Sequence, residues 1–531
     1  MRYRISQLKI DPRETVSKPL ETLLEKAVGR EIRRRARIQH AEISDLKIIR
    51  ESIDARKKPD VKLVYTVDFN CRETLPFDEA KQAEYQLPPV GNRWKAEQAC
   101  ARPVVIGFGP CGMFAALILA EAGLRPLVIE RGKAVEERVV DVERFWQTAR
   151  DGKDAVPDPE SNVQFGEGGA GTFSDGKLTT GIKDIRIRKV LTEFVEAGAD
   201  PAILYKHRPH IGTDRLRVIV PEIRKKIEKL GGEVRFSTRL EDFAFEGGNL
   251  KGVYVSGGRF IEADHVVLAL GHSARDTFEM MYERGLRMEQ KPFSIGVRIE
   301  HPQKMINESQ YGDPSLAEIL GPADYKLNYR CADSDDSRGR GVYTFCMCPG
   351  GEVINASTEA GASVTNGMSG SSRSGDYANS GLLVDVRTSD FEGEHPLAGV
   401  AFQRKYEELA WRNRTDGGLA RSTYGVFRSD AEDETGEDPV RNSIPAFAVE
   451  SILEAMPVFG RKLKGFDCDD ARLTAVETRS SSPVRVVRDE NMEAVGYKGL
   501  IPAGEGPGYA GGIMSAAVDG IRAAEKIITL T

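Results

Sequence analysis

The chain has 531 residues, of which 40% are hydrophobic and 29% are charged, and its formal net charge is -6 at pH 7. This balance is typical of a soluble globular protein with two or three domains. The negative charge argues against a protein that coats nucleic acid.

The cysteine content and the apolar stretches predict a cytoplasmic protein without a membrane segment. The seven cysteines are odd in number and scattered, which favours a reducing compartment over a disulfide framework. The first residues lack the apolar core of a signal peptide. Residues 104–129 are the most apolar stretch, but glycines and prolines interrupt them, whereas a membrane span needs about 20 nearly continuous apolar residues.

The first hundred residues predict a small α+β unit. Residues 18–38 have the pattern of a helix, and residues 61–69 alternate in the manner of a strand. Pro88, Pro89 and Gly91 indicate a linker that leaves this unit. The basic run at 30–37 is typical of a solvated helix face, with contact to nucleic acid as the less favoured interpretation.

Residues 102–132 have the order strand, glycine turn, helix, strand that opens a dinucleotide-binding fold. Gly107 permits the tight turn, Gly109 lets the backbone approach a pyrophosphate, and Gly112 allows close packing of helix and strand. The helix N-terminus stabilises the phosphate charge. Glu130 lies 18 positions beyond Gly112 (130 − 112), where an acid accepts the hydroxyls of the adenosine ribose.

Two later segments favour FAD over NAD as the dinucleotide. Residues 264–271 form an apolar strand that ends in Ala-x-Gly, and glutathione-reductase-like flavoproteins return to the nucleotide domain with such a strand. Residues 499–513 place Glu505 in a glycine-rich turn before a helix. In such flavoproteins the acid at this position contacts the ribityl or pyrophosphate region of FAD. No second GxGxxG opens another strand and helix, so a permanent NAD(P)H domain is not expected.

These elements predict an α/β fold: a Rossmann-type FAD/NAD(P)-binding domain with an inserted β-rich substrate domain and a small N-terminal α+β domain. The expected boundaries are 1–98 for the N-terminal domain, 99–285 and 471–531 for the two parts of the FAD-binding domain, and 286–470 for the substrate domain.

Six segments, at residues 107–112, 162–178, 272–280, 291–301, 345–351 and 502–512, carry a family resemblance. They make the chain similar to the uncharacterised bacterial FAD-dependent dehydrogenase family, a single-Rossmann, glutathione-reductase-like group. The resemblance covers nearly the whole chain, except that residues 416–442 match it least. It implies an FAD domain and a β-rich second domain but says little about the substrate.

The glycine-rich loop 165–177 follows the second nucleotide strand and can lay backbone N–H groups along FAD. By resemblance it lies near the isoalloxazine, although a solvated surface loop is the alternative. The residues expected to contact FAD are Gly107, Gly109, Pro110, Cys111, Gly112, Glu130, Arg131, Gly169, Ser174, Asp175, Lys177, Gly271, Gly504, Glu505, Gly511, Gly512 and Ile513. Cys111 is expected to be a small residue that fits the turn, not a redox thiol.

His272, His301, Arg298 and Lys177 are the candidate catalytic residues. Either histidine could deliver a proton near neutral pH, or serve as a structural hydrogen-bonding residue. Arg298 could hold an anionic substrate or pair with Glu300 on the same strand face.

Two further segments bear on the substrate site. Cys346 and Cys348 should share one strand face, as core residues more than as a redox pair, and no metal site is expected. Residues 478–483 are expected to face the same cleft as the flavin segment.

The leading hypothesis is an FAD-dependent oxidoreductase that exchanges hydride between flavin N5 and a small organic substrate, with NADH or NADPH as a transient donor. A flavin monooxygenase with a transient NAD(P)H site is the alternative, and residues 210–214 are the nearest imitation of its second fingerprint. An FAD-containing factor that binds or modifies nucleic acid is a third hypothesis, motivated by the basic N-terminal unit. The sequence does not determine the oligomeric state.

Overall fold

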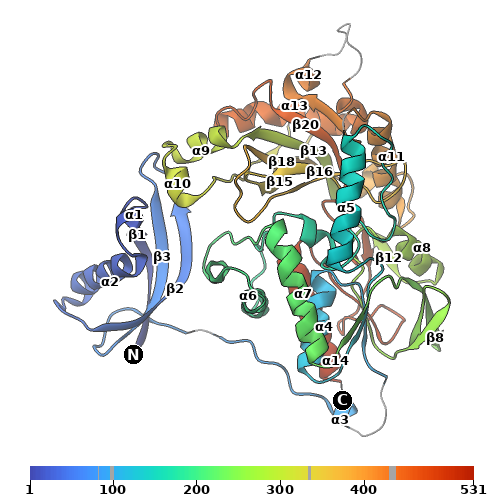
Figure 1. Ribbon diagram of the computed structural model, residues 1–531, viewed down its shortest axis with the longest axis horizontal. Coiled ribbons are helices and arrows are strands. Elements are labelled where there is room, and N and C mark those ends of the chain that lie inside the picture. Colours follow the sequence, from blue (N-terminus) through green and yellow to red (C-terminus); the bar gives the residue numbers. More distant parts are fainter. Residues whose placement is uncertain (82, 96–100, 333–335, 416, 430–437, 531) are drawn as a thin grey trace.

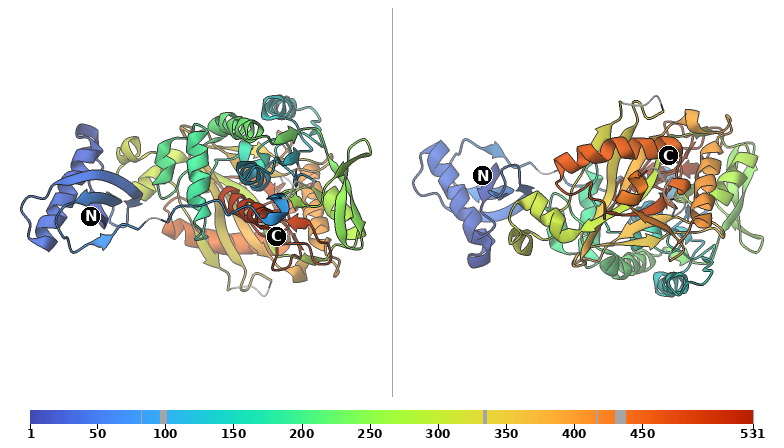
Figure 2. Two further views of the ribbon diagram at one scale, coloured as in Figure 1. Left: turned by 90° about the horizontal axis from the view of Figure 1, so that it is seen from below. Right: turned by 90° about the horizontal axis from the view of Figure 1, so that it is seen from above.

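The computed structural model describes residues 1–531 except 82, 96–100, 333–335, 416, 430–437 and 531. The N-terminal domain stands at one end of the molecule, and the nucleotide-binding and β-rich parts form the larger body (Figures 1 and 2). No described helix is both long and apolar enough to cross a membrane.

The N-terminal domain is a four-stranded sheet with helices on one face. Its strand order is β2-β3-β1-β4, with β1 (Arg2–Ile10), β2 (Ile43–Asp54), β3 (Lys62–Cys71) and β4 (Asp78–Glu79). A short α1 (Glu14–Ser17) precedes α2 (Leu20–Ala36), which buries an apolar stripe against the sheet. The expected helix at 18–38 and strand at 61–69 are confirmed. Within the basic run, Arg34 and Arg35 both pair with Glu31.

Among the described residues, the N-terminal domain contacts the larger body around residues 205–207 and around residues 309–313. The backbone of Glu51 in β2 pairs with Tyr205 and His207, and Arg50 Nη2 lies 2.8 Å from His207 Nδ1. At the second place, Arg13 pairs with Asp313 at 2.6 Å. The chain then runs along the body to α3 (Asn92–Lys95) beside the C-terminal helix (Figure 1).

The nucleotide-binding domain has a five-stranded parallel sheet of order β22-β11-β5-β6-β7. Numbered along the chain this is 5-4-1-2-3, the order of a Rossmann fold, which confirms the predicted class. The strands are β5 (Val104–Ile106), β6 (Leu127–Ile129), β7 (Glu233–Arg235), β11 (Val266–Leu268) and β22 (Leu500–Pro502). One face is covered by α4 (Pro110–Glu121), α6 (Arg186–Glu196), α7 (Thr213–Lys229) and α14 (Ile513–Ile528). The other is covered by the meander β8 (Leu240–Glu246), β9 (Asn249–Val255) and β10 (Arg259–Glu262), with α8 (Arg275–Glu283).

The β-rich domain is built on a six-stranded antiparallel sheet of order β14-β15-β18-β13-β20-β19. Its strands are β13 (Phe293–Pro302), β14 (Asn328–Arg330), β15 (Gly341–Cys348), β18 (Tyr377–Val386), β19 (Ala420–Thr423) and β20 (Arg472–Glu477). Alternate residues of β13, among them Ile295 and Val297, enter the core that α13 (Ala446–Lys462) covers.

The other α-helices and strands of the described residues connect or cover these sheets. They are α5 (Val135–Arg150), α9 (Gln303–Tyr311), α10 (Leu316–Leu320), α11 (Ala398–Arg412), α12 (Tyr424–Arg428), β12 (Met288–Gln290), β16 (Glu352–Asn355), β17 (Thr365–Met368) and β21 (Val484–Val486).

The sheet corrects one expected boundary. Residue 470 was predicted to end the β-rich domain, but β20 pairs with β13 from Arg472 to Glu477, so the domain continues through this strand. Residue 98, the expected end of the N-terminal domain, lies outside the described residues, as does part of the segment 416–442.

Candidate functional site

A cavity of about 610 Å³ lies between the parallel sheet and the β-rich domain. The segments that follow the carboxyl ends of the parallel strands contribute lining residues, including Gly107, Glu130, Thr238, Gly271 and Glu505. Ligands of open α/β sheets bind at this edge, because the loops that follow the strands converge there. The opposite wall comes from the β-rich domain.

The turn after β5 has the geometry that its glycines predicted. Gly107 adopts φ +94° and donates its N–H to Ile129 O at 2.8 Å. A Cβ on Gly112 would lie 1.9 Å from Gly107 O, so only glycine allows α4 to begin this close to the strand. A Cβ on Gly109 would meet nothing nearer than Gly169 Cα at 3.8 Å, which leaves this backbone open to the cavity.

The carboxylate of Glu130 is largely committed to the protein backbone. It accepts hydrogen bonds from Phe108 N (2.8 Å), Gly132 N (2.8 Å) and Gly166 N (2.9 Å). A carboxylate has about four acceptor sites. One site therefore remains for a ligand hydroxyl, the role that the sequence predicts for this acid.

Asp175 in the glycine-rich loop is bound by protein groups. Arg373 donates two hydrogen bonds to its carboxylate at 3.0 and 2.5 Å, and the Ser369 hydroxyl donates a third. Burial raises the pKa of Asp175, but Arg373 outweighs this effect and leaves the pKa below its ordinary value. Asp175 thus holds the loop against residues 369–373. Ser174 and Lys177 also line the cavity, and the Lys177 ammonium donates to Met347 O.

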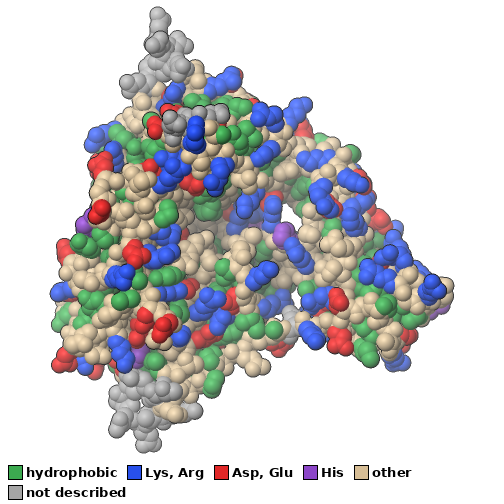
Figure 3. Space-filling view, turned by 180° about the vertical axis from the view of Figure 1, so that it is seen from behind, with side chains coloured by type: hydrophobic (Ala, Val, Ile, Leu, Met, Phe, Trp, Pro, Cys, Tyr) green, Lys and Arg blue, Asp and Glu red, His purple; other side chains and the backbone are tan. Residues whose placement is uncertain are grey.

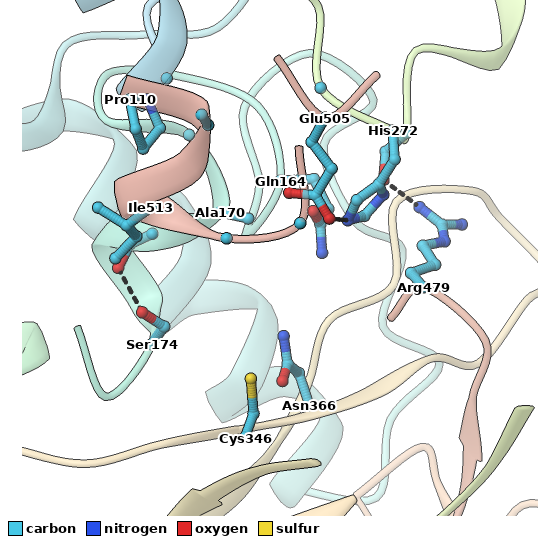
Figure 4. A pocket seen from close by; sticks show the side chains of 18 of the residues that line it. Pro110, Gln164, Ala170, Ser174, His272, Cys346, Asn366, Arg479, Glu505 and Ile513 are labelled. Carbon is cyan, nitrogen blue, oxygen red and sulfur yellow. Dashed lines mark hydrogen bonds and ion pairs between the residues drawn. The ribbon is translucent and has the colours of Figure 1, made fainter. Parts of the chain in front are cut away.

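The N-termini of α4 and α14 both face the cavity, which Figure 4 shows with Pro110 and Ile513 on one side. Gly512 caps α14, and a Cβ on Gly511 or Gly512 would meet no atom within 4 Å. Free N–H groups at two helix starts therefore point toward one open space.

Glu505 and His272 lie on the other side of the cavity, with the histidine Nε2 4.0 Å from Glu505 Oε1 (Figure 4). Burial raises the pKa of Glu505 to about 7, and Lys291 acts in the opposite direction. Burial, with Arg479 and Arg275, lowers the pKa of His272 to about 3. At neutral pH the histidine is uncharged and the glutamic acid is close to half-protonated.

Behind His272, two arginines share one carboxylate. Arg275 from α8 and Arg479 each donate to both oxygens of Glu407 in α11, at 2.8–3.1 Å, and Glu407 is fully buried. Arg479 also reaches Ser273 Oγ at 3.2 Å. The expectation that residues 478–483 face the cleft is met by Arg479 and Ser480, which line it.

Arg298 and His301 do not line the cavity. Arg298 is fully buried and pairs with Glu477 at 2.6 Å. The partner expected from strand alternation was Glu300, so that expectation is corrected: β20 lies against β13 and supplies the carboxylate. His301 is fully buried, and its Nε2 lies 2.7 Å from Phe466 O. It occupies the structural role that the sequence left open as its alternative.

Cys346 and Cys348 do not share a strand face, which corrects the prediction from alternation. The pairing of β15 with β18 is interrupted by a bulge between Phe345 and Cys348, and Cys346 adopts φ +41°. Cys346 is consequently exposed to the cavity, whereas Cys348 is buried. Although the Cys346 thiol is exposed to the cavity, the surrounding protein excludes much of its water and raises its pKa, while Arg298 and Lys177 act in the opposite direction.

The structure brings other residues to the cavity that no motif singled out, among them Gln164, Tyr325, Lys326, Phe345, Asn366 and Arg373. Gln164 and Phe345 lie in the segments that carry the family resemblance. Tyr325 and Lys326 lie in no motif, so no sequence signal could have identified them. Gly112 and Gly504 do not line the cavity; a Cβ on Gly504 would lie 2.8 Å from Cys111 Cβ. The other predicted cofactor residues line it.

Residues 210–214 are the nearest imitation of a second fingerprint. They form a turn that packs against Ser371 of the same chain. Gly212 precedes α7, and a Cβ there would lie 2.2 Å from Ser371 N. His210 Nε2 lies 3.2 Å from Ser371 O.

Residues 292–480 match the family model described as FAD-dependent protein, C-terminal domain-like, and residues 2–70 match a domain of unknown function. An uncharacterised protein of Clostridium beijerinckii is 45% identical over 513 residues, which cover 92% of this chain and 93% of that protein.

Solved structures give more distant matches. A geranylgeranyl bacteriochlorophyll reductase-like protein from Thermoplasma acidophilum is 14% identical, with 80% of this chain and 77% of that chain covered and a TM-score of 0.36. A glycerol-3-phosphate dehydrogenase from Bacillus halodurans complexed with FAD is 12% identical, with 81% and 65% covered and a TM-score of 0.35. Because these TM-scores are low, the matches carry no argument about the function of this chain.

Proposed function

We propose a function on the premise that this chain belongs to the same family as the Clostridium beijerinckii protein and contains a domain of FAD-dependent proteins. The protein binds FAD in the cavity and acts as an FAD-dependent oxidoreductase on a small organic substrate. NADH or NADPH serves as a transient electron donor.

The residues around the cavity fit FAD. Glu130 at the end of β6 has an acceptor site left for the adenosine ribose. The pyrophosphate fits at the start of α4, where Gly109 leaves the backbone open, and against the N–H groups of the glycine-rich loop. Gly511, Gly512 and Ile513 lie at the start of α14 and would hold the flavin end. The observation that carries the proposal is that one cavity joins these three features.

When bound, FAD supplies at its N5 atom an acceptor or donor of hydride for an organic substrate. Glu505 can hold or release a proton near neutral pH, because burial brings the pKa of its carboxyl to about 7. Neutral His272 offers a hydrogen-bonding nitrogen without a charge, and the guanidinium of Arg479, which Glu407 holds, binds the neighbouring Ser273 hydroxyl.

Replacement of Gly109 by valine tests the cofactor site. The new side chain would enter open space, so the protein should fold, but it would occupy the path of the pyrophosphate. We expect FAD affinity to fall by about 10-fold or more, the effect of a clash worth 1–3 kcal/mol. Visible absorbance of the purified protein, followed by titration with FAD, measures this loss.

Gly181→Val is the matched control, because a Cβ on Gly181 would meet no atom within 4 Å and Gly181 does not line the cavity. It should bind FAD like the parent protein. A parent protein that stays colourless and takes up no added FAD would contradict the proposed cofactor. Anaerobic addition of NADH or NADPH to the yellow protein tests the donor: bleaching by neither contradicts that part alone.

A further inference from the structure

Most of the cationic side chains around the cavity are neutralised by the protein. Arg131 pairs with Glu160 and Asp276, Arg239 with Glu160, Arg208 with Asp324, Arg373 with Asp175 and Arg479 with Glu407. Among the described residues, Lys177 and Lys326 line the same cavity without a carboxylate within ion-pair distance. Figure 3, which views the molecule from behind, shows Lys and Arg side chains around the hollow on that face.

These two lysines lie beside one short segment of β15. The Lys177 ammonium donates to Met347 O. Leu327 N donates to Thr344 Oγ1 at 2.8 Å and Thr344 N donates to Leu327 O at 2.9 Å, which places Lys326 next to Phe345. The Lys177 ammonium and the backbone of Lys326 therefore flank residues 345–347. A lysine has three donors, so the carbonyl at Met347 leaves Lys177 with two.

The segment between the lysines is shaped toward the cavity. It contains the bulge of β15 and the left-handed Cys346, a conformation that is unfavourable in a residue other than glycine. Buried Arg298 holds it in place by donating to Cys346 O at 2.9 Å. Bulges next to active sites re-aim side chains, and this one exposes residue 346 to the cavity.

Apolar surface lies beside the two charges. Tyr325 and Phe345 both contribute to the cavity lining, but Tyr325 is only 4% exposed and its ring packs against Phe466 in the core. The half-buried ring of Phe345 is therefore the aromatic surface offered to a ligand. An apolar body with an anionic group matches such a wall, because the ring accepts the body and the ammonium groups attract the charge.

We infer that the substrate is an organic anion, bound through its carboxylate or phosphate by Lys177 and Lys326 with its apolar body against Phe345. This inference rests on the proposed function, since it places the anion at the end of the FAD cavity that the β-rich domain forms. Loss of either ammonium group should weaken binding of the anion without changing the affinity for a neutral ligand of the same shape.

Calorimetric titration of the FAD-loaded protein with benzoate, phenyl phosphate and benzamide tests this assignment. We expect benzoate or phenyl phosphate to bind, and the stronger of the two identifies the anionic group. Benzamide, which has the same ring without the charge, should bind about 10-fold more weakly, as expected for loss of a charge-assisted hydrogen bond. Lys326→Gln should weaken binding of the anion by a similar factor and leave the affinity for benzamide unchanged.

Lys498→Gln is the control for removal of a positive charge, because Lys498 is exposed and does not line the cavity. It should bind the anion like the parent protein. Equal affinity for benzamide and for the stronger-binding anion, failure of both anions to bind, or an equal effect of Lys326→Gln and Lys498→Gln would overturn the inference. The visible spectrum separates the two claims: a protein that binds no FAD contradicts the proposed function, whereas a yellow protein that ignores the anions contradicts only this inference.

Discussion

The fold moves the ionisation of Glu505 into the neutral pH range. Its carboxyl lies against the cavity wall near neutral His272, and burial raises its pKa from 4.5 to about 7. A buried acid with a raised pKa favours the folded state most when it is protonated. Its contribution to stability is therefore complete below pH 4.5 and is lost as the pH rises to about 7.

We predict that the Glu505→Gln variant does not show this loss of stability with rising pH. Relative to the variant, the parent apoprotein should lose about 3 kcal/mol of unfolding free energy between pH 4.5 and about 7, because one pKa unit corresponds to about 1.36 kcal/mol. Denaturant unfolding of the parent protein and the variant across this interval measures the difference. Parallel pH profiles of the two proteins would show that Glu505 titrates at its ordinary pKa.

Among the elements, the contact of α4 with α14 brings the two helix starts of the cavity together. A Cβ on Gly520 would lie 2.1 Å from Cys111 O, so α14 crosses α4 at a distance that only glycine permits. Cys111 is buried in this crossing, and burial raises the pKa of its thiol well above the ordinary value. Its predicted role as a small residue that fits agrees with this position.

We predict that Gly520→Ala destabilises the protein by about 1–3 kcal/mol, because the methyl group forces the two helices apart. The displaced start of α14 should also weaken FAD binding. Gly29→Ala in α2 is the matched helical substitution: its Cβ would meet only the end of the Arg33 side chain at 3.7 Å, and it should stabilise by about 0.5–1 kcal/mol. Thermal unfolding of both variants gives the comparison, and equal effects would contradict the tight crossing.

At the scale of the whole molecule, Glu407 joins the two large domains. Arg275 follows the parallel sheet, Arg479 follows β20, and both guanidinium groups are held by this one buried carboxylate. Burial raises the pKa of Glu407, but the two arginines outweigh it and leave the pKa well below the ordinary value. The carboxylate is thus charged throughout the physiological range and fixes Arg479 at the cavity.

We predict that Glu407→Gln costs about 3–5 kcal/mol of unfolding free energy, because removing one partner leaves buried charges uncompensated. Glu408→Gln, one position away, is the control. Its carboxylate is exposed and lies 3.6 Å from Arg412, so its loss should cost less than about 1 kcal/mol. Denaturant unfolding distinguishes the two variants, and a similar small loss for both would show that the buried cluster contributes little.

The nucleotide-binding half of the protein could be predicted from the sequence. Its strand, turn and helix signals are local: Gly107 and Gly112 are required by contacts within one turn, and Glu130 stands at the end of the next strand. Such short-range constraints can be read from spacing, as can the apolar stripe of α2 in the N-terminal domain.

Sequence patterns could not predict which residues meet across the cavity, because these contacts join elements that are distant along the chain. Arg298 pairs with Glu477 instead of Glu300 since β20 lies beside β13, and the bulge in β15 separates Cys346 from Cys348. Lys326 reaches the cavity only through the pairing of its segment with residue 344. Strand register and bulges are set by packing between strands, so periodicity within a single strand could not predict them.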